Sequence, residues 1–128
     1  MFTLKVREKF SAAHAVRMPS GILESIHGHN WTVEIAVSAP ALNSSGLAVD
    51  FLELKKLLHE TVVKLDHTFL NKTGFFPPEA ATTEHVAIWI QKELEGPIEA
   101  LEPNAKLTSV TVWETPDCAV TVTKEEND

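Results

Sequence analysis

The sequence has little cysteine and no long hydrophobic run. Its single cysteine, Cys118, cannot form an intrachain disulfide, which is typical of proteins from a reducing compartment. No apolar stretch is long enough to span a membrane, and the alternating N-terminal residues MFTLKVREKF do not resemble a signal peptide. We therefore expect a cytoplasmic protein that has no membrane partner.

Positive charge is also scarce. The 128 residues carry 11 Lys and Arg against 18 Asp and Glu, a formal net charge of −7. A general nucleic-acid binder needs a basic surface that displaces counterions, so we expect no nucleic-acid partner. The length predicts one domain over residues 1–128, and we interpret the acidic end KEEND, 124–128, as a solvated tail.

Alternating apolar and polar side chains predict strands in four segments of the chain. These segments are residues 2–10, 29–38, 106–115 and 118–124. The last two segments should form a hairpin, because the Pro116-Asp117 pair between them is typical of a tight turn.

A first helix is expected at about residues 50–65. Apolar side chains recur there at helical spacing, and Asp50 can cap the first turn. Residues 65–80, which follow it, are predicted to form a loop.

A second helix should run over about residues 83–95, capped by Thr82 or Thr83 and ended by Gly96-Pro97. The order of elements is then ββααββ. This order predicts an α+β fold, with a four-stranded antiparallel sheet and both helices on one face. A sheet of this kind has two open edges, so we expect edges to pair between subunits.

Three histidines fall in the apolar register of the first two predicted strands. His27 and His29 flank Gly28, and residues two apart on a strand point to the same side. His14 extends the apolar register of Phe10. Three neutral imidazoles and one open position make a catalytic zinc site, so we predict Zn²⁺ held by His14, His27 and His29. The alternative is core or loop histidines with satisfied hydrogen bonds.

Acidic side chains stand at two further places of chemical interest. Glu114 continues the apolar face of Val110 and Val112, where a carboxylate costs free energy unless it is paired. It either binds a donor-rich heterocycle or lies in solvent where the strand ends. The pair Asp66-His67 either sets a tautomer and passes a proton, or simply begins a polar loop.

Two other glutamates have equally open interpretations. Glu84 lies in the first turn of the second predicted helix, where it most simply complements the helix dipole. Glu24 precedes His27 by three residues, at the mouth of the predicted metal site. There it is either a general base or a solvated loop residue.

Taken together, these residues resemble the 6-pyruvoyl-tetrahydropterin synthase family, which includes the 6-carboxy-tetrahydropterin synthases of queuosine biosynthesis. The matching landmarks run in order along nearly the whole chain. They are FSAAH (10–14), HGHNW (27–31), GLAVDFLELKKLL (46–58), LDHTFLN (65–71), ATTEHVA (81–87) and VWET (112–115).

The resemblance implies the tunnelling fold, in which three subunits close a barrel and two trimers stack into a homohexamer. Active sites then lie at subunit interfaces. By the same resemblance His14, His27 and His29 are the zinc ligands, and Asp66 and His67 form an acid–base relay.

The resemblance also implies a pterin pocket. Glu114 becomes the anchor of the pterin ring, with Thr83 and Glu84 near it. The implied substrate is 7,8-dihydroneopterin triphosphate, whose side-chain hydroxyls are bound by zinc.

The chain departs from the tetrahydrobiopterin and queuosine synthases at one position. Those enzymes carry a catalytic cysteine just before HGH, whereas residues 21–26 here contain none and Cys118 lies far along the chain. The segment reads E-x-x-H-G-H, which resembles the glutamate-type branch of folate synthesis, with Glu24 in place of the thiolate.

This departure favours a zinc-dependent lyase that cleaves the side chain to leave 6-hydroxymethyl-7,8-dihydropterin. Two alternatives stay open: a 6-carboxy- or 6-pyruvoyl-tetrahydropterin synthase, and a pterin-binding homologue that has lost catalysis.

Overall fold

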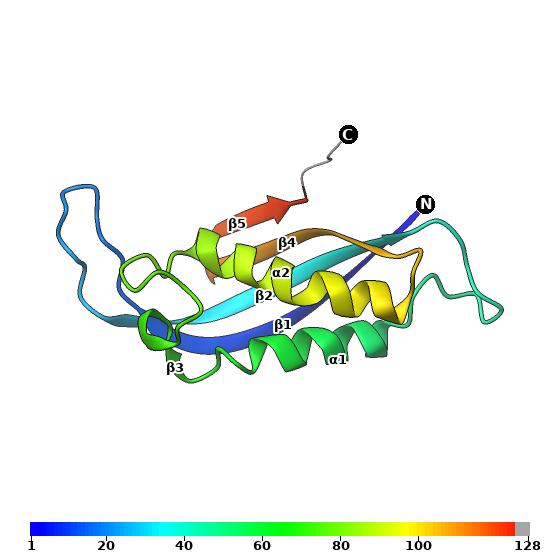
Figure 1. Cartoon of the computed structure of the whole chain (residues 1–128), viewed down its shortest axis with the longest axis horizontal. Helices are drawn as coiled ribbons and strands as arrows, with labels where there is room; N and C mark the ends of the chain where they lie inside the picture. The colour runs from blue at the N-terminus through cyan, green and yellow to red at the C-terminus, as the bar shows by residue number, and fades with distance from the viewer. Residues whose placement is uncertain (125–128) are drawn as a thin grey trace.

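The structure, a computed structural model, describes residues 1–124 and contains a single sheet and two α-helices (Figure 1). The elements in chain order are β1 (Phe2–His14), β2 (His27–Ala39), α1 (Phe51–Val62), β3 (Thr68–Phe69), the short 3₁₀ helix η1 (Leu70–Lys72), α2 (Thr83–Leu101), β4 (Lys106–Thr115) and β5 (Cys118–Thr123).

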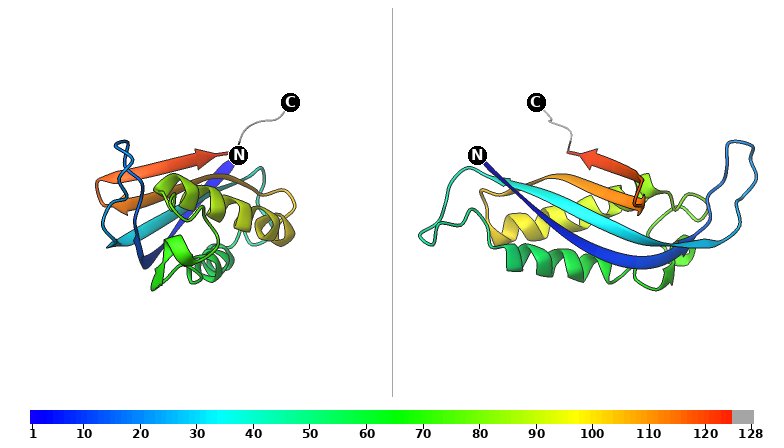
Figure 2. Two further views of the ribbon diagram at one scale, coloured as in Figure 1. Left: turned by 60° about the vertical axis from the view of Figure 1, so that its left-hand side comes forward. Right: turned by 180° about the vertical axis from the view of Figure 1, so that it is seen from behind.

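Both helices cover the same face of the sheet, as predicted (Figures 1 and 2). The strand order is β3-β1-β2-β4-β5. Alternate side chains of β1, β2 and β4 point toward the helices and form the core, with Trp31, Ile35 and Val110 fully buried. The opposite face of the sheet is polar and has no helix over it (Figure 2). The predicted α+β class is therefore confirmed.

The two strands of the central pair are longer than predicted. β1 reaches His14 and β2 begins at His27, so the antiparallel ladder runs from the pair Phe2–Ala39 to the pair His14–His27. The residues between them form a long arm, 15–26, that extends beyond the helices (Figure 1). The extra length matters because it carries all three histidines onto one end of the ladder.

The prediction of a four-stranded, wholly antiparallel sheet is wrong in one detail. A fifth strand, β3, pairs with Ala12 and Ala13 of β1 in parallel. The Asp66 carboxylate accepts a hydrogen bond from Ser11 N–H at 2.8 Å, and His67 N–H donates to the Ser11 carbonyl at 2.6 Å. These bonds hold the predicted loop against the edge of β1, so two residues enter the sheet.

The predicted end of the second helix is also wrong. α2 continues through Gly96 and Pro97 and ends at Leu101. A proline inside a helix removes one backbone hydrogen bond. Here Leu94 and Ile98, on either side of that point, are almost completely buried. Burial of this apolar stripe outweighs the lost hydrogen bond and keeps the chain helical.

The predicted helix starts are confirmed, whereas the end of the first helix is not. The Asp50 carboxylate and the Thr82 hydroxyl each accept a hydrogen bond from a backbone N–H of the following turn. α1 ends at Val62, because the chain turns there to bury Leu65.

Residues 125–128 of the predicted acidic tail lie outside the described residues. No helix within residues 1–124 is long and apolar enough to cross a membrane.

Candidate metal centre and active site

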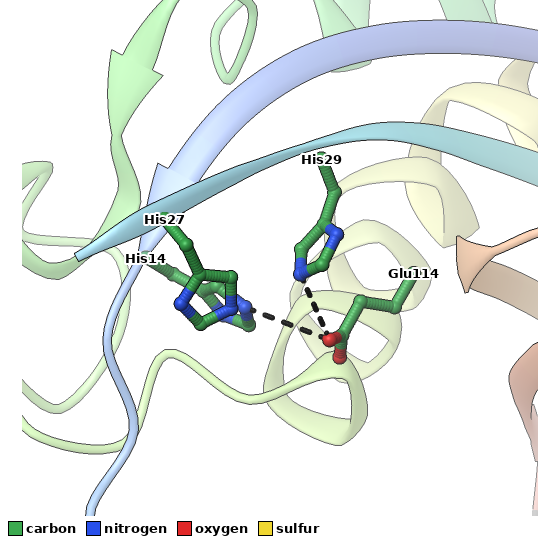
Figure 3. Close-up of side chains that lie close together, drawn as sticks. All are labelled: His14, His27, His29 and Glu114. Carbon is green, nitrogen blue, oxygen red and sulfur yellow. Dashed lines mark ion pairs between the residues drawn. The ribbon is translucent and has the colours of Figure 1, made fainter. Parts of the chain in front are cut away.

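The three predicted ligand histidines lie together at one end of the central ladder. His14 is the last residue of β1 and faces His27, the first residue of β2. The centroid of the His14 ring lies 4.7 Å from that of His27 and 5.3 Å from that of His29. Figure 3 shows the rings converging from the two strands. The prediction that these side chains share one face is confirmed.

Backbone carbonyls fix the tautomers of two of these rings. His14 Nδ1 lies 2.8 Å from the Ala81 carbonyl, and His27 Nδ1 lies 2.8 Å from the Ser25 carbonyl. A carbonyl oxygen only accepts, so each Nδ1 carries the proton and donates it. Each Nε2 therefore presents a lone pair, the arrangement that orients metal-binding histidines.

Two of the Nε2 atoms make no hydrogen bond within the part of the chain that the structure describes. His14 and His29 both bury this nitrogen without a hydrogen bond. Leaving a buried polar atom unsatisfied costs about 1–3 kcal/mol, and such an atom in a native structure calls for an explanation. Lone pairs aimed at a common point fit a metal ion, because a metal satisfies all of them together.

Burial also keeps one of these imidazoles in the form that can bind a metal. Desolvation lowers the pKa of His29 below its ordinary value, Glu114 raises it, and the neighbouring His14 and His27 lower it again. The net direction is downward, so His29 stays neutral at neutral pH. A neutral imidazole is the form that donates its lone pair to a metal.

Glu114 adds a carboxylate to this cluster. It is the predicted pterin anchor, and its Oε1 lies 3.0 Å from His29 Nε2 (Figure 3). One ligand atom from each of the three histidines and Glu114 lies within 4.8 Å of the others. Thr83 is buried and donates its hydroxyl proton to Glu114 Oε2 at 2.7 Å. Glu84 is exposed on α2, and no hydrogen bond or ion pair joins it to the cluster within residues 1–124.

Glu24 lies at the mouth of the cluster, as its spacing from His27 predicts. Its Oε1 is 3.8 Å from His27 Nε2. The carboxylate accepts a hydrogen bond from Val16 N–H at 2.9 Å, and Glu24 N–H donates to the Val16 carbonyl at 3.0 Å. The base of the long arm therefore holds this side chain beside the histidines, with about a third of it exposed to solvent.

Asp66 and His67 lie at the edge of β1 and not in the cluster. No hydrogen bond or ion pair within residues 1–124 joins them to the three histidines, although His67 and His29 border the same shallow hollow. The hydrogen bond from Ser11 N–H lowers the pKa of Asp66, and the adjacent His67 lowers it further. His67 has a left-handed backbone, with φ of 58°, and its side chain is largely exposed.

Several groups that support the site had no signal in the sequence. Trp31 forms its floor: the indole packs edge-on against His14 and His29 and donates to the Ala12 carbonyl at 3.1 Å. Its apolar register predicted burial but not this contact. The carbonyls of Ser25 and Ala81 were not predictable, because any residue supplies a carbonyl and only the tertiary structure places it.

Comparison with known proteins identifies the family of this chain. The sequence pattern of the 6-pyruvoyl tetrahydropterin synthase family matches residues 3–125. A dihydroneopterin monophosphate aldolase of Pyrococcus furiosus is 36% identical over 108 residues, which cover 84% of this chain and 85% of that protein. A 6-carboxy-5,6,7,8-tetrahydropterin synthase of Bacillus subtilis is 37% identical over 120 residues, which cover 90% and 80% of the two chains.

The fold has close counterparts among solved structures. The structure of Caenorhabditis elegans 6-pyruvoyl tetrahydropterin synthase superposes with a TM-score of 0.78 at 26% identity, covering 97% of this chain and 96% of that one. Sequence pattern, relatives and fold thus agree over nearly the full length. The chain belongs to the 6-pyruvoyl tetrahydropterin synthase family.

Proposed function

We propose that this protein is a zinc-dependent lyase that cleaves the side chain of a phosphorylated 7,8-dihydroneopterin and releases 6-hydroxymethyl-7,8-dihydropterin. The observation that carries the proposal is the position of Glu24, a carboxylate fixed 3.8 Å from His27 Nε2, where the family's synthases are expected to use a thiolate. The Pyrococcus furiosus relative, a dihydroneopterin monophosphate aldolase, supports the same reaction class.

The residues present fit the metal that this reaction needs. His14, His27 and His29 would hold Zn²⁺ through Nε2. The tautomers of His14 and His27 are fixed for this, and the Nε2 atoms of His14 and His29 are buried without a hydrogen bond. When bound, the ion supplies Lewis acidity toward the hydroxyl groups of the substrate side chain.

Glu24 is then the group that takes the proton. Cleavage between the first and second side-chain carbons begins with loss of the proton from the hydroxyl on the second carbon. That carbon leaves as an aldehyde, and the bonding electron pair stays on the first carbon, conjugated with the pterin ring. A proton returned to the first carbon completes the hydroxymethyl group. Val16 N–H orients the Glu24 carboxylate for the first of these transfers.

Replacing Glu24 tests this role. We expect Glu24→Gln and Glu24→Ala to lower kcat by about 10²–10⁴-fold, the usual contribution of a general base. The assay supplies zinc-loaded protein with the monophosphate and, separately, the triphosphate of 7,8-dihydroneopterin, and identifies the pterin product by mass. Zinc content measured in parallel should be unchanged, because Glu24 lies outside the group of four ligand atoms.

The outcome of this assay also separates the alternatives. A 6-carboxy or 6-pyruvoyl product would mean that the protein is a synthase, the activity of the Bacillus subtilis relative. Cys118, the only cysteine, is exposed at the start of β5, and no hydrogen bond joins it to the histidines among the described residues. Bound pterin without any product would point to a binding protein.

We further propose that the protein works as a homo-oligomer, with trimers that close a barrel and stack in pairs. Residues 2–10 of β1 pair with no strand on the outer edge of the sheet among the described residues, and β5 leaves the other edge open. The long arm exposes large apolar side chains, among them Ile22 and Ile26, which are 64% and 65% exposed. Open edges and exposed apolar side chains are features that assembly covers.

Assembly gives Asp66 and His67 a place in the reaction. Each pair would serve the site of a neighbouring subunit, where the imidazole returns the proton to the first side-chain carbon. Left-handed backbone at a residue other than glycine is uncommon, and residues of this kind gather at functional sites. His67, with φ of 58°, is therefore a candidate for such a role.

Mixed oligomers test this arrangement. Oligomers reassembled from equal amounts of His29→Ala and His67→Ala chains should regain roughly a quarter of the wild-type activity. With random mixing, about a quarter of the shared sites combine an intact His29 from one subunit with an intact His67 from its neighbour. Each variant alone should be inactive. Mixed oligomers that form but stay inactive would contradict sharing between subunits, and a monomer in light scattering would contradict assembly itself.

A further inference from the structure

The side chain of Glu114 joins helix α2 to the histidine cluster. Glu114 follows Val110 and Val112 at alternate positions of β4, so its side chain lies on the face that the helices cover. One carboxylate oxygen accepts the Thr83 hydroxyl proton at 2.7 Å. The other lies 3.0 Å from His29 Nε2 and 3.8 Å from His14 Nε2 (Figure 3). The carboxylate is thus directed at the ligand nitrogens.

This geometry differs from that of a residue reserved for the pterin ring. Three imidazole nitrogens and one carboxylate oxygen make a complete tetrahedral set for zinc, with no position left over. A catalytic site instead keeps one position free for substrate. Glu114 therefore stands where an oxygen of the substrate would have to bind.

The surroundings of Glu114 allow its carboxylate to leave that position. About a third of its side chain is exposed to solvent, so the carboxylate has room to rotate outward. A carboxylate has about four lone-pair sites, and Thr83 occupies only one of them. The NH and NH₂ edge of a pterin offers two donors side by side, which a carboxylate accepts in a strong, charge-assisted pair of bonds.

We propose that Glu114 has two partners in turn. Without substrate it is the fourth ligand of the metal, and when a pterin ring binds, Glu114 moves to the NH and NH₂ donors of the ring. The metal centre is then open to substrate only when the ring is in place. This inference rests on the proposed function, because it takes the site to hold zinc and a pterin.

Cobalt(II) substitution in the full-length protein tests the resting state. The visible bands of cobalt(II) change in position and intensity with the kind of ligands that bind it. We expect the spectra of Glu114→Gln and Glu114→Ala to differ from the wild-type spectrum, because water replaces the carboxylate in the fourth position. Zinc affinity, measured by competition with a chelator, should fall about 10–100-fold or more in these variants, since loss of even an outer partner of a ligand costs that much.

Glu24→Gln is the matched control for this measurement. Glu24 is also a glutamate next to the cluster, at 3.8 Å from His27, but it lies outside the four-atom group. Its variant should keep the wild-type cobalt spectrum and zinc affinity. If Glu114→Gln behaves in the same way, Glu114 is not a ligand and the proposal is overturned. Thermal melts of the apo forms check that each variant is folded.

The exchange of partners is tested with 7,8-dihydropterin, which lacks the side chain and cannot itself bind through hydroxyl groups. Adding it should shift the cobalt spectrum of the wild type toward that of Glu114→Gln and leave the spectrum of Glu114→Gln unchanged. A wild-type spectrum that does not respond to bound pterin would overturn the exchange. Product formation together with such a spectrum would leave the proposed lyase function intact, whereas a responsive spectrum without product would support the exchange and contradict the lyase.

Discussion

Replacing His29 by alanine is expected to abolish lyase activity and to weaken zinc binding by at least about 100-fold. The change removes one of the three proposed zinc ligands, and loss of only an outer hydrogen-bond partner of a ligand already costs about 10–100-fold in affinity. We expect a large effect at His29 because its Nε2 is buried without a hydrogen bond and lies 3.0 Å from Glu114 Oε1. Zinc content after dialysis and product formation measure the two effects.

His59→Ala is the matched control for this prediction. His59 lies on α1 with its side chain mostly exposed, and its nearest charged partner is Glu8, at 3.9 Å. Its replacement should leave zinc content and turnover as they are in the wild type. A His29→Ala protein that binds zinc with unchanged affinity would show that the three histidines do not form the metal centre.

Replacing Trp31 by alanine should cost about 3–5 kcal/mol in the free energy of unfolding, the usual effect of deleting a buried aromatic side chain. Trp31 is 0% exposed and stacks on Phe10 at a centroid distance of 5.6 Å. It also supports the edges of His14 and His29. A small domain has about 5–15 kcal/mol in total, so the variant should be marginally stable. Urea unfolding of the apo protein measures the loss.

Two other tryptophan variants set the scale for this experiment. Trp31→Phe keeps an aromatic ring on Phe10 but loses the hydrogen bond to Ala12, so it should cost considerably less than the alanine variant. Trp113→Ala changes a half-buried ring on the uncovered face, next to Arg7, and should also cost less. If all three variants were equally stable, the packing under the site would not depend on Trp31.

Much of the fold was predictable from local patterns. Alternation in residues 2–10 and 29–38 gave the two central strands, and the capping residues Asp50 and Thr82 marked where the helices begin. The errors fell where distant contacts outweigh a local preference. Gly96-Pro97 is a strong local stop, yet burial of Ile98 carries α2 past it. β3 depends on hydrogen bonds between residues 11 and 66–67, which no local pattern contains.

Some features of the candidate site were likewise predictable from the sequence, and others were not. The sequence by itself determined that His27 and His29 share a face, because strands repeat every two residues whatever they pair with. It also determined the glutamate at position 24 and the absence of a cysteine before HGH. These local facts were sufficient to suggest a metal centre and to favour a carboxylate as its base.

Only the tertiary structure decided how these groups meet. Strand pairing set His14 opposite His27, the fold of the long arm brought Glu24 against Val16, and packing of α2 on β4 placed Thr83 beside Glu114. The physical reason is that side chains far apart in sequence meet only through strand register and helix packing, which depend on the burial of the whole core. The direction of the Glu114 carboxylate, toward the histidines, is a property of that packing.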